Sequence, residues 1–438
     1  MSATQVELSL DHPGVYHTAG VSKGAAVRAS NVLQENHDNH HIFFNPEGFH
    51  NHIAHHILTL YAIGATPDDI QRHYEDNKTY QIPPRPIDKG ILEDLNDYEK
   101  FQHYLGKGEY YNDYLLFFQA EIDKKGFETV ITDYCLKHDK RASDMLVRLH
   151  AGFLHPMIHL GFGIEFKQPA IIAEALAETA VHDDWIGPFF LETEKAAATT
   201  DKGKSIVELL DEVRADRKLS TAADWNDANK IRDGIMVRAP EKMIKYASQW
   251  KVTPDQLVDK TAEMTNAAIY YTGGAQNPPK QVKFDFYYMH CVNCSIFYHT
   301  FLDLPWISDE NKARLLEWKG RLDLCMYASR RSPEPLIDEI VNYKPKRPAD
   351  KWDDIFLRAR KHEDDGHCCK LVRAIAHGEK LCEGYDADDP RFRIKGDMWL
   401  QLGHMAIDSV EDSGNPWVRS AGFPQAWENF KDRPRAQL

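Results

Sequence analysis

Residues 49–65 read FHNHIAHHILTLYAIGA, and this stretch indicates both the fold class and the kind of site that the chain carries. Its apolar residues recur at three- and four-residue spacing up to Gly64, which is typical of a helix that ends at a glycine. His52, His55 and His56 are spaced to share one face of that helix. Because histidine is the commonest metal ligand, the stretch predicts a metal held inside a helical body. The alternative is a solvated polar first turn.

The rest of the chain is also patterned as helices. TPDD at residues 66–69 combines a capping residue, a proline and two acids in the first turn of a helix. TPDQ at residues 253–256 repeats this pattern as a capping box before an apolar helical run. Alternating runs bounded by Asn-Gly or Asp-Gly turns are missing. We therefore predict an all-α fold in a single large domain, residues 1–438, with the metal inside its core. A division into two lobes near residue 275 is the alternative.

Composition narrows the class of protein further. The formal net charge of −14 argues against a nucleic-acid partner, since phosphates require a basic surface. No basic start precedes an apolar run at the N-terminus, and the most apolar stretch, residues 286–302, contains too many polar residues to span a bilayer. Seven cysteines in a long chain suit reduced thiols. We expect a cytoplasmic protein with no nucleic-acid or membrane partner.

A second histidine pair lies in GFLHPMIHLGFGIEF, residues 152–166. His155 and His159 are four residues apart, so they face the same side of a short apolar helix that can begin at Pro156. The acid of a zinc-protease HExxH motif is absent between them. The pair predicts either metal ligands or two core histidines bonded to carbonyl groups.

A third histidine lies in FDFYYMHCVNCSIFYHTF, residues 284–301. His290 is surrounded by aromatic and apolar residues, so a buried ring there needs a partner for each nitrogen. Asn293 is three residues on and shares its helix face. Cys291 and Cys294 form a CxxC pair without two further ligands at matching spacing, so we interpret them as small packing residues.

The fourth segment is KHEDDGHCCKLVRA, residues 361–374. His367 and Lys370 lie one helical turn apart, and Asp364 and Asp365 precede them where acids stabilise a helix start. Apolar neighbours indicate that Lys370 is partly buried, and a buried lysine loses its charge easily. A neutral amine can react with carbon dioxide to give a carbamate, which is an anionic metal ligand. The alternative is a capped helix with an exposed lysine.

Two absences bear on the chemistry. The chain has no G-x-G-x-x-G after a strand, so a Rossmann flavin or nicotinamide site is not supported. It also has no G-x-S-x-G, so an α/β hydrolase is not supported.

Taken together, five motifs resemble the fungal questin oxidase-like proteins, which are anthraquinone ring-opening oxygenases of polyketide pathways. The resemblance covers essentially the whole chain, and its motifs occur in order: NHHIFF (39–44), FHNHIAHHILTLYAIGA, GFLHPMIHLGFGIEF, YMHCVNCSIF (288–297) and EDDGHCCKLVRA (363–374). The resemblance implies an all-α fold and oxidative cleavage of the central ring of an anthraquinone, giving a benzophenone acid. Members have been described as Baeyer–Villiger oxidases, and one branch as non-haem iron dioxygenases.

The iron branch implies a ligand set of four histidines and a carboxylated lysine. Carried onto this sequence, its motifs fall on His52, His155, His290, His367 and Lys370. His56, His159, Asn293 and Asp364 would then lie around the metal or face the substrate. The choice of His52 over His56 and of His155 over His159 stays open.

We therefore expect a non-haem Fe(II) oxygenase with dioxygen as co-substrate and an anthraquinone, or its hydroquinone, as substrate. The sequence leaves open whether a pathway reductase takes part. A Baeyer–Villiger oxidase that uses NADPH on the same substrates is one alternative. A helical HD-type phosphohydrolase is another, suggested by His182-Asp183 and by residues 362–365. The third is a non-catalytic helical binding protein.

Overall fold

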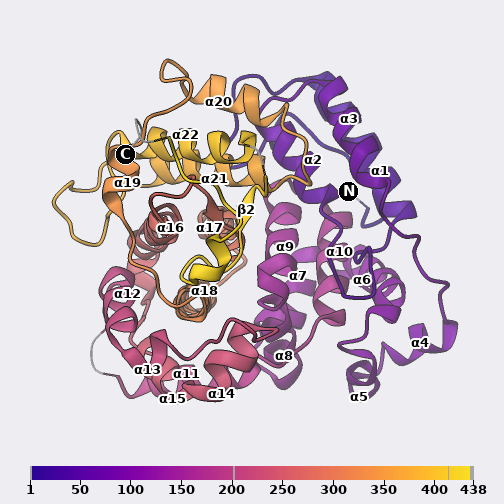
Figure 1. Cartoon of the computed structure of the whole chain (residues 1–438). Coiled ribbons are helices and arrows are strands. Elements are labelled where there is room, and N and C mark those ends of the chain that lie inside the picture. Colours follow the sequence, from indigo (N-terminus) through magenta and orange to yellow (C-terminus); the bar gives the residue numbers. More distant parts are fainter. Residues whose placement is uncertain (1, 201–202, 413, 435–438) are drawn as a thin grey trace. The chain divides into compact units, whose positions relative to one another are not determined.

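Helices make up almost all of the regular structure in the computed structural model, which describes residues 2–200, 203–412 and 414–434 (Figure 1). Within those ranges the only sheet pairs two strands of two residues each, β1 (Phe284–Asp285) and β2 (Trp417–Val418), in parallel. The predicted all-α fold is confirmed. None of the described helices is long and apolar enough to cross a membrane.

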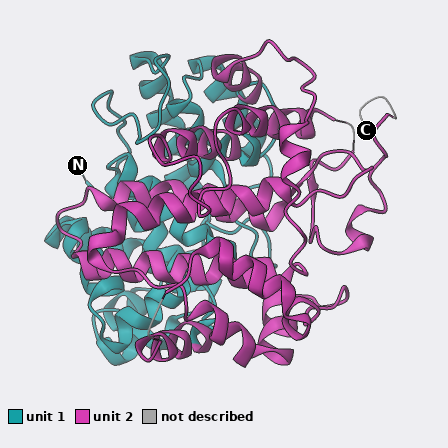
Figure 2. Ribbon diagram, turned by 90° about the vertical axis from the view of Figure 1, so that its left-hand side faces the viewer, with its two compact units in different colours: residues 1–187, 360–370 teal, residues 188–359, 371–438 magenta. Residues whose placement is uncertain are grey.

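The chain folds into two compact units (Figure 2). Unit 1 contains residues 1–187 and 360–370, and unit 2 contains residues 188–359 and 371–438. Residue 275, near which a division was considered, lies inside unit 2. Both units are discontinuous in sequence, because the chain returns to unit 1 for eleven residues before it completes unit 2.

The helices of unit 1 alternate with short connections. They are α1 (Lys23–Asn39), α2 (Ile53–Ala62), α3 (Pro67–Lys78), α4 (Lys89–Asp94), α5 (Tyr98–Phe101), α6 (Tyr111–Lys125), α7 (Phe127–Ile131), α8 (Lys140–Leu149), α9 (His155–Glu165) and α10 (Pro169–Val181). Short helical turns add η1 (Gln102–Tyr104), η2 (Gly108–Tyr110), η3 (Thr132–Leu136) and η4 (Gly152–Leu154). The predicted capping residue at the start of α3 is confirmed, since Thr66 Oγ1 accepts a hydrogen bond from Asp69 N at 3.1 Å.

Helix α10 is buried along its whole length, from Pro169 to Val181. A helix that is apolar on nearly every side has no face suited to water, so it becomes core. It packs against α9, α6 and α8. Close packing with α9 requires Gly163, because a Cβ atom there would lie 2.7 Å from Ile172 Cγ1 and 2.9 Å from Ile172 N. Two acids, Glu174 and Glu178, are buried with this helix.

Unit 2 is built in the same way. Its helices are α11 (Gly187–Ala198), α12 (Ile206–Ala215), α13 (Arg217–Ser220), α14 (Met236–Arg238), α15 (Pro240–Ala247), α16 (Leu257–Gly274), α17 (Phe286–Leu302), α18 (Asp309–Ser329), α19 (Ile337–Val341), α20 (Trp352–Ala359), α21 (His367–Leu381) and α22 (Met398–Glu411). Short turns are η5 (Lys230–Ile235), η6 (Pro254–Gln256) and η7 (Pro424–Trp427). Helix α11 starts at the last residue of unit 1, and the first turn of α21 also belongs to unit 1. Helices α16, α17 and α18 pack against one another.

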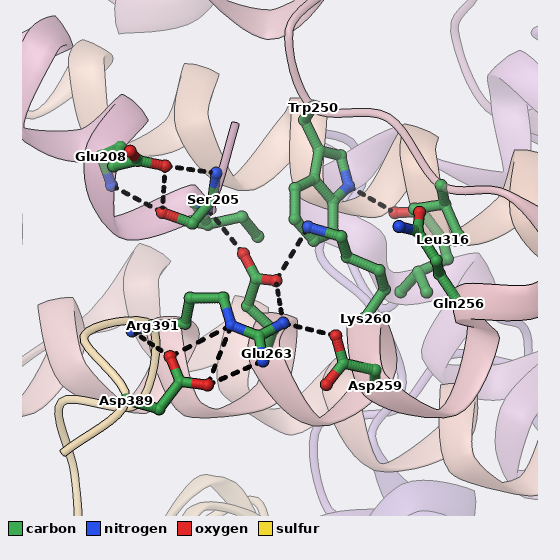
Figure 3. Close-up of polar contacts among 12 residues, drawn as sticks. Ser205, Glu208, Trp250, Gln256, Asp259, Lys260, Glu263, Leu316, Asp389 and Arg391 are labelled. Atoms are coloured by element: carbon green, nitrogen blue, oxygen red, sulfur yellow. Dashed lines mark hydrogen bonds and ion pairs between the residues drawn. The ribbon is translucent and has the colours of Figure 1, made fainter. Parts of the chain in front are cut away.

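A buried carboxylate fixes the ends of several of these segments (Figure 3). Glu263 of α16 accepts hydrogen bonds from Ile206 N and Lys260 Nζ, both at 2.9 Å. Arg391 lies 3.7 Å from the same carboxylate and also binds Asp389 at 2.7 Å. Because every partner is polar and close, this network offsets the cost of burying Glu263 and holds the start of α12 and the loop at Arg391 against α16.

Replacing Gly163 with alanine should destabilise the protein by about 1–3 kcal/mol, a typical cost of overpacking. The added methyl group would meet backbone of α10, which cannot move without shifting a fully buried helix. Gly24→Ala in α1 is the matched control, because the nearest atom to its added Cβ, Pro67 Cγ, is 3.4 Å away. Urea unfolding of both variants makes the comparison. Equal stability would show that the contact between α9 and α10 is not tight.

Candidate metal centre

The start of α2 carries the first histidine of the site. His52 is the capping residue of α2, and all ten residues of the helix are buried. Asn51 sets the entry of the chain: its Oδ1 accepts from Ile53 N at 2.9 Å, and its Nδ2 donates to Asn36 Oδ1 of α1 at 2.8 Å. His52, His55 and His56 are all nearly inaccessible to water. The alternative of a solvated first turn is therefore wrong.

Three imidazoles from distant parts of unit 1 converge. His52 Nε2 lies 2.9 Å from His155 Nε2, and the ring centres of His52 and His367 are 4.7 Å apart. One ring nitrogen of each of the three lies within 4.8 Å of the corresponding nitrogens of the others. All three side chains are buried. The sequence intervals between them exceed one hundred residues, so the fold alone brings them together.

The outer nitrogen of each ring faces an oxygen atom. His155 Nδ1 donates to the Gly152 carbonyl at 2.5 Å, and His367 Nδ1 donates to Asp365 Oδ1. His52 Nδ1 lies 3.2 Å from the other oxygen of the same carboxylate, Asp365 Oδ2. A carbonyl or carboxylate oxygen can only accept, so the proton of a neutral ring stays on Nδ1 and the lone pair on Nε2. Metal-ligating histidines are oriented in this way.

The pKa shifts at this site also favour neutral histidine rings that could bind a metal. Burial, with a further contribution from nearby Lys370, lowers the pKa of His52 to about 4, so this ring is neutral at neutral pH. Burial alone would raise the pKa of Asp365, but His367 and His52 hold it well below its ordinary value. Unprotonated nitrogens that face each other at 2.9 Å repel unless a cation lies between them. The donor set therefore fits a divalent metal with a preference for imidazole.

A left-handed turn positions His155. Gly152, Phe153 and Leu154 have φ angles of 52°, 55° and 71°, and His155 is the first residue of α9. Only glycine adopts this region without strain, and a residue such as leucine costs about 1–2 kcal/mol there. Such strain persists only where surrounding structure imposes it, and it is concentrated at functional sites.

Asp364, Asp365 and Gly366 position His367. Asp364 accepts from the amides of Gly366 at 2.7 Å and Cys368 at 2.8 Å, so its carboxylate caps the start of α21. Gly366 has a φ of 92°, and a Cβ there would lie 2.7 Å from His56 Cβ. Glycine at this position lets the segment approach α2 closely enough for Asp365 to meet both histidines. Sequence reasoning treated both acids as helix-start residues and missed this role of Asp365.

Lys370 is buried, with 4% of its surface exposed. Burial, which disfavours the charged amine, lowers its pKa. The predicted burial of this side chain is confirmed and the alternative of an exposed lysine is wrong. The carbamate stays a prediction.

His56 and His159 have partners of their own in unit 1. His56 Nδ1 binds Asn77 Oδ1 at 2.9 Å, and His159 Nε2 binds Glu174 Oε2 at 2.8 Å. The structure thus groups His52 and His155 with His367, whereas His56 and His159 bind other side chains.

His290 and Asn293 lie on α17 of unit 2, and both are buried. His290 Nδ1 donates to the Phe286 carbonyl at 2.6 Å, so this ring has the same tautomer as His155. Asn293 Nδ2 is 2.9 Å from Met289 Sδ. Cys291 and Cys294 are buried free thiols, and burial raises the pKa of Cys294 to about 12, as suits packing residues. His290 as a fourth ligand stays a prediction.

The fold and this histidine centre define an all-helical protein with a buried cluster of imidazoles that could hold a metal ion. Comparison with known proteins gives the family. The family model described as questin oxidase-like matches residues 49–375. The chain is 40% identical to Baeyer-Villiger oxidase ptaJ of Pestalotiopsis fici over 97% of this chain and 98% of that protein. It is 41% identical to Oxidoreductase AflY of Aspergillus parasiticus (96% and 92%) and 36% identical to Questin oxidase of Aspergillus terreus (97% of each).

The chain belongs to the questin oxidase-like family, and it is an enzyme of the oxidoreductase class. The resemblance stated from the sequence motifs is confirmed.

Asp365→Asn should weaken metal binding by about 10- to 100-fold, the usual effect of removing a group that orients ligands. The amide offers one acceptor oxygen where the carboxylate serves two rings. Glu363→Gln, an exposed position two residues away, is the control and should bind metal like the wild type. Competition with a chromogenic chelator measures the affinity. An unchanged affinity in Asp365→Asn would show that the carboxylate does not orient the ligands.

Proposed function

We propose that this chain is a non-haem Fe(II) oxygenase that cleaves the central ring of an anthraquinone, in its hydroquinone form, to a benzophenone acid. The observation that carries the proposal is the pair of Nε2 atoms of His52 and His155, 2.9 Å apart in a buried site with His367 beside them. The similarity to relatives named questin oxidase and Baeyer-Villiger oxidase supports an oxidation of this substrate class.

The proposed ligands are His52, His155 and His367 of unit 1, His290 of unit 2 and a carbamate on Lys370. Four neutral imidazoles leave a divalent ion with no anionic ligand. Asp365 faces the outer nitrogens and Asp364 binds amides, so neither supplies one. The amine of buried Lys370 is the remaining candidate on the same helix turn as His367. Its lowered pKa supports the proposal, because carbon dioxide reacts only with the neutral amine.

The chain's own residues have defined tasks in this proposal. Asp365 and the Gly152 carbonyl hold the protons of the ligand rings at Nδ1, so that Nε2 stays available. The burial of the three histidines excludes water from the reacting centre. The chemistry that Fe(II) would supply there is the binding and activation of dioxygen beside the substrate. One hydroquinone and one dioxygen together contain all the atoms of the benzophenone acid. The reaction therefore needs no electron donor other than the hydroquinone, which is two electrons more reduced than the anthraquinone.

The names of several relatives favour a second candidate, a Baeyer–Villiger oxidation. That reaction inserts one oxygen atom of dioxygen into the ring to give a lactone, and NADPH reduces the other oxygen atom to water. A water molecule must then open the lactone. Isotope labelling separates the two candidates. Under ¹⁸O₂, the iron-dependent reaction places two labelled atoms in the acid, whereas the Baeyer–Villiger route followed by hydrolysis places one.

The first test is therefore turnover of an anthraquinone hydroquinone by anaerobically purified protein reloaded with Fe(II). We expect turnover without NADPH, two ¹⁸O atoms in the product by mass spectrometry, and loss of activity after iron chelation. Turnover that persists after chelation, needs NADPH and incorporates one labelled atom would replace the iron mechanism with the Baeyer–Villiger one.

Lys370 variants test the carbamate. Lys370→Met should lower iron content and turnover by at least about tenfold, since it removes the only proposed anionic ligand. Lys370→Glu restores a carboxylate and should retain more iron than the methionine variant. Lys380→Met, an exposed position on the same helix, is the control and should behave as wild type. Full iron occupancy and activity in Lys370→Met would leave a site of histidines alone.

A further inference from the structure

A second cluster of ionisable groups lies in unit 1, beside the histidine centre. Glu178 and His182 are one turn apart at the end of α10, and His50 precedes α2. His50 Nε2 lies 2.7 Å from His182 Nε2. Glu178 Oε1 lies 3.6 Å from His50 Nε2 and 3.9 Å from His182 Nε2. The ligand atoms of these three residues all fall within 4.8 Å of one another.

The carboxyl group of Glu178 has no hydrogen-bond donor among the described residues, although only 1% of its side chain is exposed. Leaving a buried carboxyl without a partner is costly, and more so if it is charged. Glu174, one turn earlier on α10, shows the contrast. Its two oxygens bind His37 Nδ1 at 2.6 Å and His159 Nε2 at 2.8 Å. The same helix therefore carries one carboxylate that is hydrogen-bonded at both oxygens and one that is not.

The two imidazoles are held in place by their surroundings. Phe43 packs edge-on against both the His50 and the His182 rings, with ring centres 5.4 Å apart in each case. Gly152 lies against His182, and a Cβ there would be 2.5 Å from His182 Cε1. Arg148 donates to the His182 carbonyl at 2.5 Å. The cluster is thus a prearranged set of donors rather than a group of mobile side chains.

We propose that His50, Glu178 and His182 form a second site for a divalent transition-metal ion, separate from the histidine centre. Two imidazoles and one carboxylate are a known ligand set for zinc and for non-haem iron, with positions left for water or another ligand. A metal bound by the two Nε2 atoms and Glu178 Oε1 would give the buried carboxyl a partner. The proposal does not depend on which reaction the enzyme performs.

The second site adjoins the first through stacked rings. The His50 ring lies parallel to the His155 ring, with an angle of 6° and 3.9 Å between their centres. His159 Nδ1 approaches the second oxygen of Glu178 at 3.4 Å. A metal bound at the second site would therefore hold the His50 ring against which His155 packs. We assign this metal a structural role beside the histidine centre.

Metal stoichiometry tests the proposal. The full-length protein is stripped of metal, dialysed against Co²⁺ or Zn²⁺, and the bound ions are counted by mass spectrometry. We expect Glu178→Gln to bind one ion fewer per chain than the wild type. Glutamine keeps the size of the side chain and buries no charge, so the variant should fold. His182→Asn, which removes a different ligand, should give the same loss and serves if Glu178→Gln does not fold.

Glu174→Gln is the matched control, because it changes a buried carboxylate of the same helix that already has two histidine partners. It should bind as many ions as the wild type. Equal numbers of ions in wild type, Glu178→Gln and His182→Asn would overturn the proposal and leave a shared proton between His50 and His182.

Discussion

The carboxylate of Asp365 is the contact on which the arrangement of the histidine centre depends. Its two oxygens meet the Nδ1 atoms of His52 and His367, which lie at the starts of two different helices. One charged group thereby faces two rings and brings two helix ends together. The hydrogen bond to His367 is charge-assisted and therefore short and directional, so it constrains that ring more tightly than packing alone. The strained turn before His155 performs the same task for the third ring with a carbonyl oxygen.

Helix α10 adds a second level of organisation. A helix that is buried on all sides would be expected to carry no charge, yet Glu174 and Glu178 lie inside it. Glu174 joins His37 to His159 and so links α1, α9 and α10 through a buried acid. Neighbouring imidazoles hold its pKa at about 2 against the opposing effect of burial, which keeps it ionised. Buried histidines in this unit are therefore distributed between a structural carboxylate and sites suited to metal.

Much of the fold could be predicted from the sequence, because helical periodicity and capping residues are local properties. The burial of Lys370 followed from its apolar neighbours in the same way. The roles of Asp364 and Asp365 could not be separated, since two consecutive acids before a glycine give no periodic signal. Glu178 was equally hidden. The sequence shows that Glu178 lies one helical turn before His182. Its nearness to His50, more than one hundred residues away, arises only from the tertiary fold.

Unit 1 is built from two separate segments of the chain, and this has a consequence for the synthesis of the protein. Asp365 and His367 leave the ribosome more than two hundred residues after His155. At about 5–20 residues per second, the histidine centre stays incomplete for roughly 10–40 s after His155 has been synthesised. A fragment that stops at Gly187 would lack both this carboxylate and His367. The histidine centre of this enzyme is therefore completed only after the segment 360–370 has been synthesised.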